Sequence, residues 1–429
     1  MRIGAYVYPW DVDGDPAAAE RIAGLGVREV VLAAAYHAVR AVTPFHPGHR
    51  IVTRDAAVYY RPGPGRWAGS PLRPAEPDSP APCDGPAGRP ELAGSFERAA
   101  ERLRAAGLTV SAWVVVAHND RLAAAHPEYA VRNAYGDTYP WALCVASPQV
   151  ARYAATLAAE IAALGCAGGV ELEACGWYGF GHLSAHDKTG GRPPGGTPGW
   201  LLDVCFCASC CAAFREAGID PGGLARSVRA ALDEGFAREG GRPREPAPGL
   251  PAELGEALAA VRSAVAGRFL DGVLTAVREA APGTPALVHS HPDPRQAGAN
   301  PGYDPAVLLG PGGADGIVLS CPGPAEASAG LVAKTAAAVP RAAGAPQGSG
   351  QPGSGPRPGG GGAGEPRVAA TLTGVTALGA RTSELPAQAR AVLAAGATEL
   401  RLYHAGLASP ADLAAMRDMV TAVRRDRLR

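Results

Sequence analysis

Lysine is nearly absent from this sequence: Lys188 and Lys334 are the only two, and arginine supplies the rest of the 40 basic residues. Aspartate and glutamate also total 40, so the formal net charge is zero. Surfaces that bind nucleic acid or anionic membranes carry an excess of basic residues. The balance of charge therefore argues against both kinds of partner.

Long apolar runs are missing as well. The sequence contains no run of about 18 uncharged apolar residues, the length that suggests a membrane span. Its beginning, MRIGAYVYPW, has no signal-like apolar segment and is typical of a strand. We therefore expect a cytoplasmic protein, in which the nine cysteines serve as reduced thiols or metal ligands. A homo-oligomer is compatible with the sequence.

Short β-branched runs alternate along the chain with longer helical patterns rich in alanine, leucine and arginine. This strict strand-then-helix order predicts a parallel sheet of the α/β class, and eight such units predict a closed (β/α)8 TIM barrel. A doubly wound open sheet is the alternative, but no GxGxxG motif follows the first strand. The expected strands are residues 3–7, 29–34, 109–116, 169–173, 286–289, 316–320, 368–372 and 399–403.

The chain has 429 residues, whereas a minimal barrel needs about 250, so long loops must hold the surplus. We expect one barrel domain over residues 1–429, with insertions after strands 2, 4 and 6. Residues 61–91 form a Pro/Gly-rich loop, and residues 174–281 hold the cysteine cluster and extra helices. Residues 340–366 are of low complexity, which is typical of a disordered loop.

Aromatic and histidine residues gather at the C-terminal ends of the predicted strands, where barrel enzymes place their chemistry. Aromatic rings stack on the apolar faces of sugars, and histidine and asparagine side chains hydrogen-bond sugar hydroxyls. These residues favour a carbohydrate ligand, although ordinary loop packing is an alternative explanation for the aromatics. The candidate binding residues are Tyr8, Trp10, Tyr36, His37, His118, Asn119, Trp177, Tyr178, His182, His289, His291 and Tyr403.

Two glutamates interrupt the apolar fourth strand in the sequence GGVELEACGWYG. Side chains alternate along a strand, so Val170 and Leu172 share one face and Glu171 and Glu173 point into the barrel. Glu173 lies at the rim, where shielding by aromatic rings would raise its pKa and suit a general acid. Glu171 lies deeper. It is either a second catalytic carboxylate or a structural group neutralised by an arginine or histidine of the barrel floor.

Several cysteines crowd into the segment CFCASCCAAF. The C-x-C-x-x-C spacing of Cys205, Cys207 and Cys210 is tight enough for three thiolates to reach one tetrahedral zinc ion. Such a closed site would be structural, and its fourth ligand would come from elsewhere in the chain. The alternative is that these thiols are small buried apolar side chains. No organic cofactor is expected.

Three segments occur in a telling order: LCVASPQVARYAATLAAEIAALG, then GGVELEACGWYG, then CFCASCCAAF. Over residues 143–214 the chain thereby resembles glycoside hydrolase family 42, a family of β-galactosidases on a (β/α)8 barrel. It is also similar in outline to other glycosidase-like barrels with the same cysteine segment. The resemblance implies that Glu173 is the general acid/base. It also implies a structural zinc held by Cys144, Cys205, Cys207 and Cys210.

We therefore expect a glycoside hydrolase with Glu173 as its acid. A second carboxylate should face Glu173, yet the predicted seventh strand, residues 368–372, contains none. A separation of about 5–5.5 Å between the two carboxyls would predict retention, and about 6.5–9.5 Å inversion. Glu171 is one candidate on the same strand. Candidates on other rim segments are Asp11, Asp120, Asp187 and Asp293, of which Asp11 and Asp120 come first because they follow strands directly.

Two other functions fit the same residues. A metal-dependent isomerase or hydrolase would use the rim histidines His118, His289 and His291 together with Glu173. A sugar-binding barrel without catalysis would account for the missing carboxylate on the seventh strand. Sugar turnover, sugar binding and metal content would separate the three functions.

Overall fold

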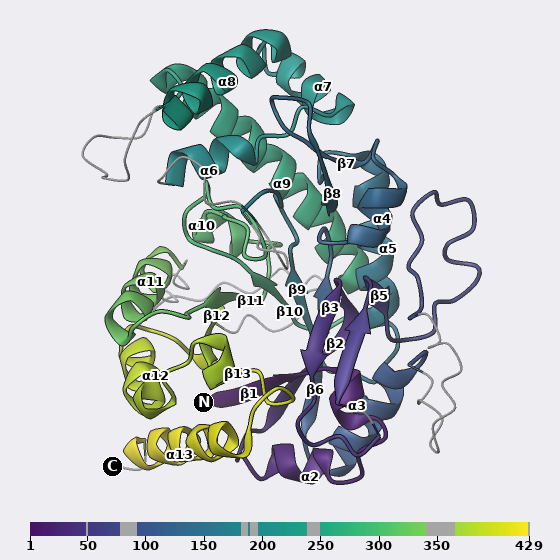
Figure 1. Ribbon diagram of the computed structural model, residues 1–429, viewed down its shortest axis with the longest axis vertical. Helices are drawn as coiled ribbons and strands as arrows, with labels where there is room; N and C mark the ends of the chain where they lie inside the picture. The colour runs from purple at the N-terminus through teal and green to yellow at the C-terminus, as the bar shows by residue number, and fades with distance from the viewer. Residues whose placement is uncertain are drawn as a thin grey trace, which may run out of the picture.

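Parallel strands close into a barrel in the computed structural model (Figure 1). The structure describes residues 1–48, 50–77, 92–181, 188, 196–237, 249–339 and 365–427. The sheet closes because β1 pairs in parallel with both β2 and β13. The barrel strands are β1 (Arg2–Val7), β2 (Glu29–Tyr36), β6 (Thr109–Val115), β9 (Val170–Glu173), β10 (Ala286–His289), β11 (Gly316–Ser320), β12 (Arg367–Thr373) and β13 (Glu399–Tyr403). The predicted (β/α)8 barrel is confirmed.

Short additional strands lie in the loops at the rim of the barrel. β5 (Ala57–Val58) adds to the edge of β2 in antiparallel register. One hairpin joins β3 (Val39–Val42) to β4 (Ile51–Arg54), and a second joins β7 (Ala130–Arg132) to β8 (Thr138–Leu143). Both hairpins extend loops that follow barrel strands, so they lie on the side where the candidate site is expected.

Helices surround the barrel (Figure 1). Every residue of β2 is buried, because the barrel interior covers one face of the strand and helices cover the other. Only the four-residue α10 follows β10, so this connection is mostly loop. None of the helices in the described ranges combines the length and apolar character that a bilayer crossing requires. The helices outside the largest insertion are α1 (Pro9–Val12), α2 (Ala18–Ala23), α3 (Ser95–Ala105), α4 (Asp120–Ala125), α5 (Pro148–Ala162), α10 (Pro305–Leu308), α11 (Ala325–Ala338), α12 (Leu385–Ala394) and α13 (Pro410–Asp426), with 3-10 turns at Thr376–Leu378 and Thr382–Glu384.

The last helix shows how local sequence sets an element boundary. α13 begins at Pro410 because Ser409 and Asp412 cap it reciprocally. The Asp412 N–H donates to the Ser409 hydroxyl at 3.2 Å, and the Ser409 N–H donates to the Asp412 carboxylate at 3.0 Å. Proline at the first helical position has no N–H to satisfy, so the start of the helix is unambiguous.

The connection between β9 and β10 holds the helices α6 (Gly196–Leu202), α7 (Ala208–Glu216), α8 (Pro221–Ala237) and α9 (Ala252–Ala280). The first three lie together at one end of the molecule, and the long α9 runs from them along the barrel beside α5 (Figure 1). This insertion contains the cysteine segment. Cys205, Cys207 and Cys210 therefore belong to the connection that follows β9.

The Pro/Gly-rich loop after β2 is anchored through a buried glutamate of α5. Glu160 accepts hydrogen bonds from the Tyr60 hydroxyl at 2.7 Å, the Gly63 N–H at 2.7 Å and the Trp67 indole at 2.8 Å. The loop up to residue 77 is thereby fastened to the barrel wall. Residues 78–91 of this loop and residues 340–364 of the low-complexity segment lie outside the described residues.

Candidate functional site

Glu173 occupies the C-terminal end of β9, beside the third barrel strand. Its Oε2 accepts a hydrogen bond of 2.6 Å from the Trp113 indole of β6. The residue is 8% exposed, and its Oε1 has no hydrogen-bond partner among the described residues. Burial raises the pKa of Glu173, and neither the nearby His289 nor the Trp113 hydrogen bond cancels this effect. A carboxyl with one oxygen held and a raised pKa is suited to donating a proton.

Glu171 lies one layer deeper on the same side of β9 and is only 1% exposed. The Tyr6 hydroxyl donates to its Oε2 at 2.8 Å, and the Arg401 Nε donates to its Oε1 at 2.9 Å. Burial alone would raise the pKa of Glu171. The charge of Arg401 and the hydrogen bonds from His289 and Tyr6 outweigh burial and lower it to about 2. Glu171 is therefore an ionised carboxylate and has no proton to donate at neutral pH.

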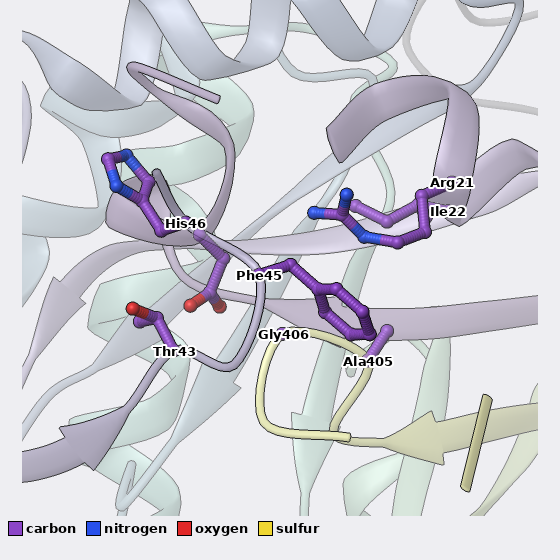
Figure 2. A pocket seen from close by; sticks show the side chains of 8 residues that line it. Arg21, Ile22, Thr43, Phe45, His46, Ala405 and Gly406 are labelled. Atoms are coloured by element: carbon purple, nitrogen blue, oxygen red, sulfur yellow. The ribbon is translucent and has the colours of Figure 1, made fainter. Parts of the chain in front are cut away.

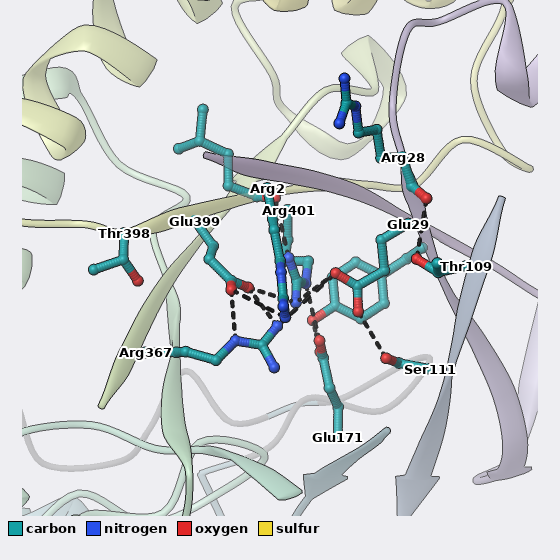
Figure 3. Close-up of polar contacts among 12 residues, drawn as sticks. Arg2, Arg28, Glu29, Thr109, Ser111, Glu171, Arg367, Thr398, Glu399 and Arg401 are labelled. Carbon is teal, nitrogen blue, oxygen red and sulfur yellow. Dashed lines mark hydrogen bonds and ion pairs between the residues drawn. The ribbon is translucent and has the colours of Figure 1, made fainter. Parts of the chain in front are cut away.

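An ionic network fills the floor of the barrel beneath Glu171 (Figure 3). The fully buried Arg401 lies at its centre, with ion pairs to Glu171 at 2.9 Å, Glu399 at 3.0 Å and Glu29 at 3.3 Å. Arg367 adds a second guanidinium on Glu399 at 2.5 Å. This floor supplies the neutralising arginine that the structural alternative for Glu171 requires.

Glycine in the first strand makes room for this network. A Cβ at Gly4 would lie 3.1 Å from the Cδ of Arg401, closer than ordinary van der Waals contact allows. Gly4 and Arg401 are register partners on adjacent strands. The missing side chain on β1 thus leaves the space that the arginine of β13 occupies.

Aromatic rings wall the barrel mouth around Glu173. Tyr8 stands edge-on to Tyr36 at 4.9 Å between ring centroids, and its hydroxyl donates to that of Tyr36 at 3.0 Å. Trp113 packs against Tyr36 at 4.7 Å and against the partly exposed Tyr403 at 6.2 Å. These rings come from four barrel strands or their ends. Tyr8, Tyr36 and Trp113 are buried and Tyr403 is partly exposed, so these rings form a packed aromatic layer that contains hydroxyl groups.

A row of stacked rings continues from this mouth along the rim. Tyr36 stacks on His37 at 4.1 Å, His37 on His118 at 4.2 Å, and His118 on Tyr178 at 4.5 Å. His37 and His118 are partly exposed, whereas Tyr178 is buried. The row therefore joins the ends of β2, β6 and β9 into one surface.

Asn119 caps α4 by accepting from the Leu122 N–H at 2.9 Å.

Two of the predicted binding residues contribute to packing. Trp10 is completely buried, stacked on Tyr8 at 4.4 Å and edge-on to Tyr59 at 5.0 Å. Trp177 carries the Arg262 guanidinium 4.3 Å from its ring centroid and donates its indole N–H to the Arg262 carbonyl. The rings of both tryptophans and the N–H of Trp177 are thus engaged within the fold, and a part in substrate binding stays a prediction.

The two rim aspartates lie on short helices that follow β1 and β6. Asp11, on α1, accepts from the Tyr8 N–H at 2.8 Å, and burial raises its pKa to about 7. It borders a separate small hollow between α2 and the β3–β4 hairpin, whose other lining residues appear in Figure 2. Asp120 starts α4. Within the described ranges, no hydrogen bond or ion pair joins either aspartate to Glu173, Trp113 or His289.

The rim histidines that the structure describes do not assemble a metal site. His289 is buried beside both glutamates, with Nε2 3.5 Å from Glu171 Oε2 and Nδ1 3.8 Å from Glu173 Oε2. His291 instead accepts from the Asp293 N–H at 3.0 Å. His182 lies outside the described residues. In the described part of the chain, no group of three ligands forms from His118, His289, His291 and Glu173.

Four buried cysteines converge where the insertion meets the connection between β8 and α5: Cys144, Cys205, Cys207 and Cys210. Their sulfur atoms all lie within 4.8 Å of one another, and Cys144 Sγ is 3.4 Å from Cys210 Sγ. Hydrogen bonds from Cys144, Cys205 and Cys210 lower the pKa of the Cys207 thiol. Four sulfurs at these separations fit the ligand set of one four-coordinate ion.

A buried arginine links this cluster to the loop that leaves β9. Arg262 of α9 donates to the Asp203 carbonyl at 2.9 Å, and its own carbonyl accepts from the Trp177 indole at 2.9 Å. The Asp203 carboxylate accepts from the Phe180 N–H at 2.5 Å. The segment from Trp177 to Asp203 is thus tied at both ends to the helix beside the cysteines.

The sequence motifs did not predict four residues of the site: Tyr6, Trp113, Arg401 and Arg262. The first three carried a usable signal, because they alternate with Tyr8, Ser111 and Tyr403 on the inward faces of their strands. The same two-residue period identified Glu171 and Glu173. Arg262 lies in an ordinary helical pattern and carried no such signal.

Comparisons with known proteins agree with this barrel. No protein-family model and no curated protein matches the chain. Solved structures do: the PgaB (BpsB) glycoside hydrolase domain from Bordetella bronchiseptica has a TM-score of 0.56 and 14% identity over 98% of each chain. α-L-Fucosidase isoenzyme 2 from Paenibacillus thiaminolyticus has a TM-score of 0.54 and 12% identity over 99% of this chain and 49% of its own. β-Galactosidase from Marinomonas ef1 has a TM-score of 0.53 and 12% identity over 100% of this chain and 60% of its own.

These structural neighbours are glycoside hydrolases, and at this level of identity the likeness shows a shared glycosidase-like barrel fold. The chain spans about half the length of the fucosidase and about three-fifths of the β-galactosidase. Membership of family 42 stays a prediction.

Proposed function

We propose that this protein is a glycoside hydrolase in which Glu173 is the general acid. The observation that carries the proposal is the environment of this carboxyl: it lies at the rim end of the fourth strand, Trp113 holds one oxygen, and burial raises its pKa. Glu173 Oε1 is then the atom that protonates the leaving oxygen. The glycosidase-like fold and the aromatic walls of the mouth support a carbohydrate as the substrate.

Glu171 plays a different part in this proposal. It is a fixed anion below the mouth, held by Arg401 and Tyr6, and it stabilises positive charge that develops on the sugar. Asp120 is the proposed second carboxylate. The negative charges of both Glu173 and Asp120 contribute to the raised pKa of Tyr178, after burial, so both carboxylates lie within electrostatic range of one phenol.

We also propose that the four-cysteine cluster holds a structural zinc ion. Zinc favours four thiolates in a closed tetrahedral site, and the insertion offers that set. The ion would fix the loop after β9 and take no part in bond cleavage. Thiol ligands of this kind suit the reducing cytoplasm.

The decisive experiment replaces Glu173 by glutamine and assays a panel of aryl glycosides. General acid catalysis typically contributes 10²–10⁴-fold, so E173Q should lose about that factor on substrates with poor leaving groups. Loss should be much smaller on dinitrophenyl glycosides, whose leaving group needs little protonation. E128Q, at an exposed glutamate, is the matched control. Equal activity of E173Q and wild type would refute the role, and sugar binding without turnover in wild type would favour a non-catalytic barrel.

A further inference from the structure

His289 stands between the two glutamates of β9. It ends β10, the strand beside β9, and is 6% exposed. Its Nε2 lies 3.5 Å from Glu171 Oε2 and 3.3 Å from the Tyr6 hydroxyl, and its Nδ1 lies 3.8 Å from Glu173 Oε2. One imidazole therefore offers one nitrogen to the fixed anion and the other to the proposed acid.

The hydrogen-bond donors around this imidazole can be counted. The single proton of the Tyr6 hydroxyl is donated to Glu171, so the Tyr6 oxygen is free to accept from His289 Nε2. Trp113 donates its only N–H to Glu173 Oε2. With Nε2 carrying a hydrogen, Nδ1 is the nitrogen left to exchange a proton with Glu173.

The remaining neighbours of His289 leave this exchange undisturbed. Trp113 of β6 lies parallel to the imidazole at 6.4 Å and is uncharged. The register partner on β11 is the apolar Val318. Arg401 of β13 acts behind Glu171, where two other carboxylates share its charge. Among the residues that the structure describes, the charged and titratable groups that face His289 directly are therefore Glu171, Glu173 and Tyr6.

We infer that Glu173 and His289 share one proton as a coupled pair, in which the proton lies either on Glu173 Oε1 or on His289 Nδ1, and that His289 is the positioning residue that sets which of the two carries it. The inference rests on the proposed function of Glu173 as the acid. A separation of 3.8 Å between Glu173 Oε2 and His289 Nδ1 is too long for a hydrogen bond, so the two groups act on each other through charge. Shared protons of this kind titrate as a property of the pair.

The proton balance of the reaction follows. As the glycosidic C–O bond breaks, the O–H bond of Glu173 breaks and a new O–H bond forms on the leaving oxygen. The pair then carries one proton fewer. The water that adds to the sugar carbon gives up a proton, and this proton restores the pair, so hydrolysis consumes one water and no other reactant.

The test follows the Glu173 carboxyl by carbon-13 NMR across pH in the full chain without substrate, with the signal assigned by its loss in E173Q. In H289Q the titration of Glu173 should become a single step and move to higher pH by about one unit, because a nearby positive charge is lost. The matched control is H126Q. His126 Nδ1 also lies 3.4 Å from a carboxylate, that of Glu128, but on the surface, and its removal should leave the Glu173 signal unmoved.

An unchanged Glu173 titration in folded H289Q would overturn the shared proton. Should H289Q fail to fold, nitrogen-15 spectra of the His289 ring in wild type and E173Q give the same answer, and identical His289 titrations would overturn the inference. In kinetics, the basic limb of kcat/KM should move with the NMR titration while KM stays constant. If NMR shows that Glu173 and His289 titrate together but wild type hydrolyses no glycoside, the proton pair is supported and only the glycosidase proposal is refuted.

Discussion

Replacing Arg401 by methionine should destabilise the protein by about 3–5 kcal/mol at neutral pH. The substitution keeps much of the side-chain volume but leaves Glu171, Glu29 and Glu399 without the guanidinium they share at 2.9, 3.3 and 3.0 Å. Removing one partner of a buried ion pair costs this much because an uncompensated charge stays in the interior. Glu171 gives an independent figure. Its pKa is about 2 against an ordinary 4.5, which corresponds to about 3 kcal/mol of stability above that pH.

The sign of the pH dependence follows from the same pKa. Because the folded-state pKa of Glu171 is depressed, its contribution is fully present above pH 4.5 and is lost as the pH falls toward about 2. In R401M burial dominates and raises the pKa of Glu171, so this loss on acidification should disappear. Wild type and variant should therefore differ most at pH 7, and the difference should shrink as the pH falls from 4.5 toward about 2.

Urea unfolding followed by tryptophan fluorescence, at pH 7 and at steps down to pH 3, measures this difference. The matched control is R390M, which removes a partly exposed ion pair with Asp426 at 2.6 Å and should cost no more than about 1 kcal/mol. The double variant R401M/E171Q should recover part of the loss, because one unpaired charge is gone. A loss for R401M no larger than that for R390M would refute the reasoning about the barrel floor.

Three further outcomes are expected. Trp113→Phe removes the indole hydrogen bond that lowers the pKa of Glu173, so the basic limb of kcat/KM should move to higher pH; an unmoved limb contradicts the acid assignment. Cys207→Ser should remove close to one equivalent of zinc by elemental analysis and lower Tm by several degrees; full zinc content in the variant argues against the four-sulfur site. Asp120→Asn should lose about 10²-fold or more in turnover and regain activity with azide; wild-type activity removes Asp120 as the second carboxylate.

The barrel could be predicted from the sequence because its strands are short, buried and regularly spaced. Three expected strands coincide with the observed Ala286–His289, Gly316–Ser320 and Glu399–Tyr403, and the other five differ by one or two residues at their ends. These are local signals.

The site was harder to predict, because its contacts join strands that are far apart in the chain. Alternation along β9 placed both glutamates inside the barrel, but nothing near Glu171 in sequence indicates Arg401, which is 230 residues away. Likewise, alternation does not tell which aromatic rings face the mouth: Trp113 holds Glu173, whereas Trp10 is completely buried. The fourth cysteine, Cys144, came only from the family resemblance, since 66 residues separate it from Cys210.

The cysteine cluster has a consequence for the fourth strand that concerns the path of the chain. Cys144 precedes β9, and Cys205, Cys207 and Cys210 follow it, so an ion bound to all four would close the chain into a loop through that strand. A slip of β9 by one residue would turn both glutamates out of the barrel. An ion bound to all four sulfurs would hold the chain on both sides of β9, and it would thereby oppose a slip that turns the glutamates away from the barrel interior.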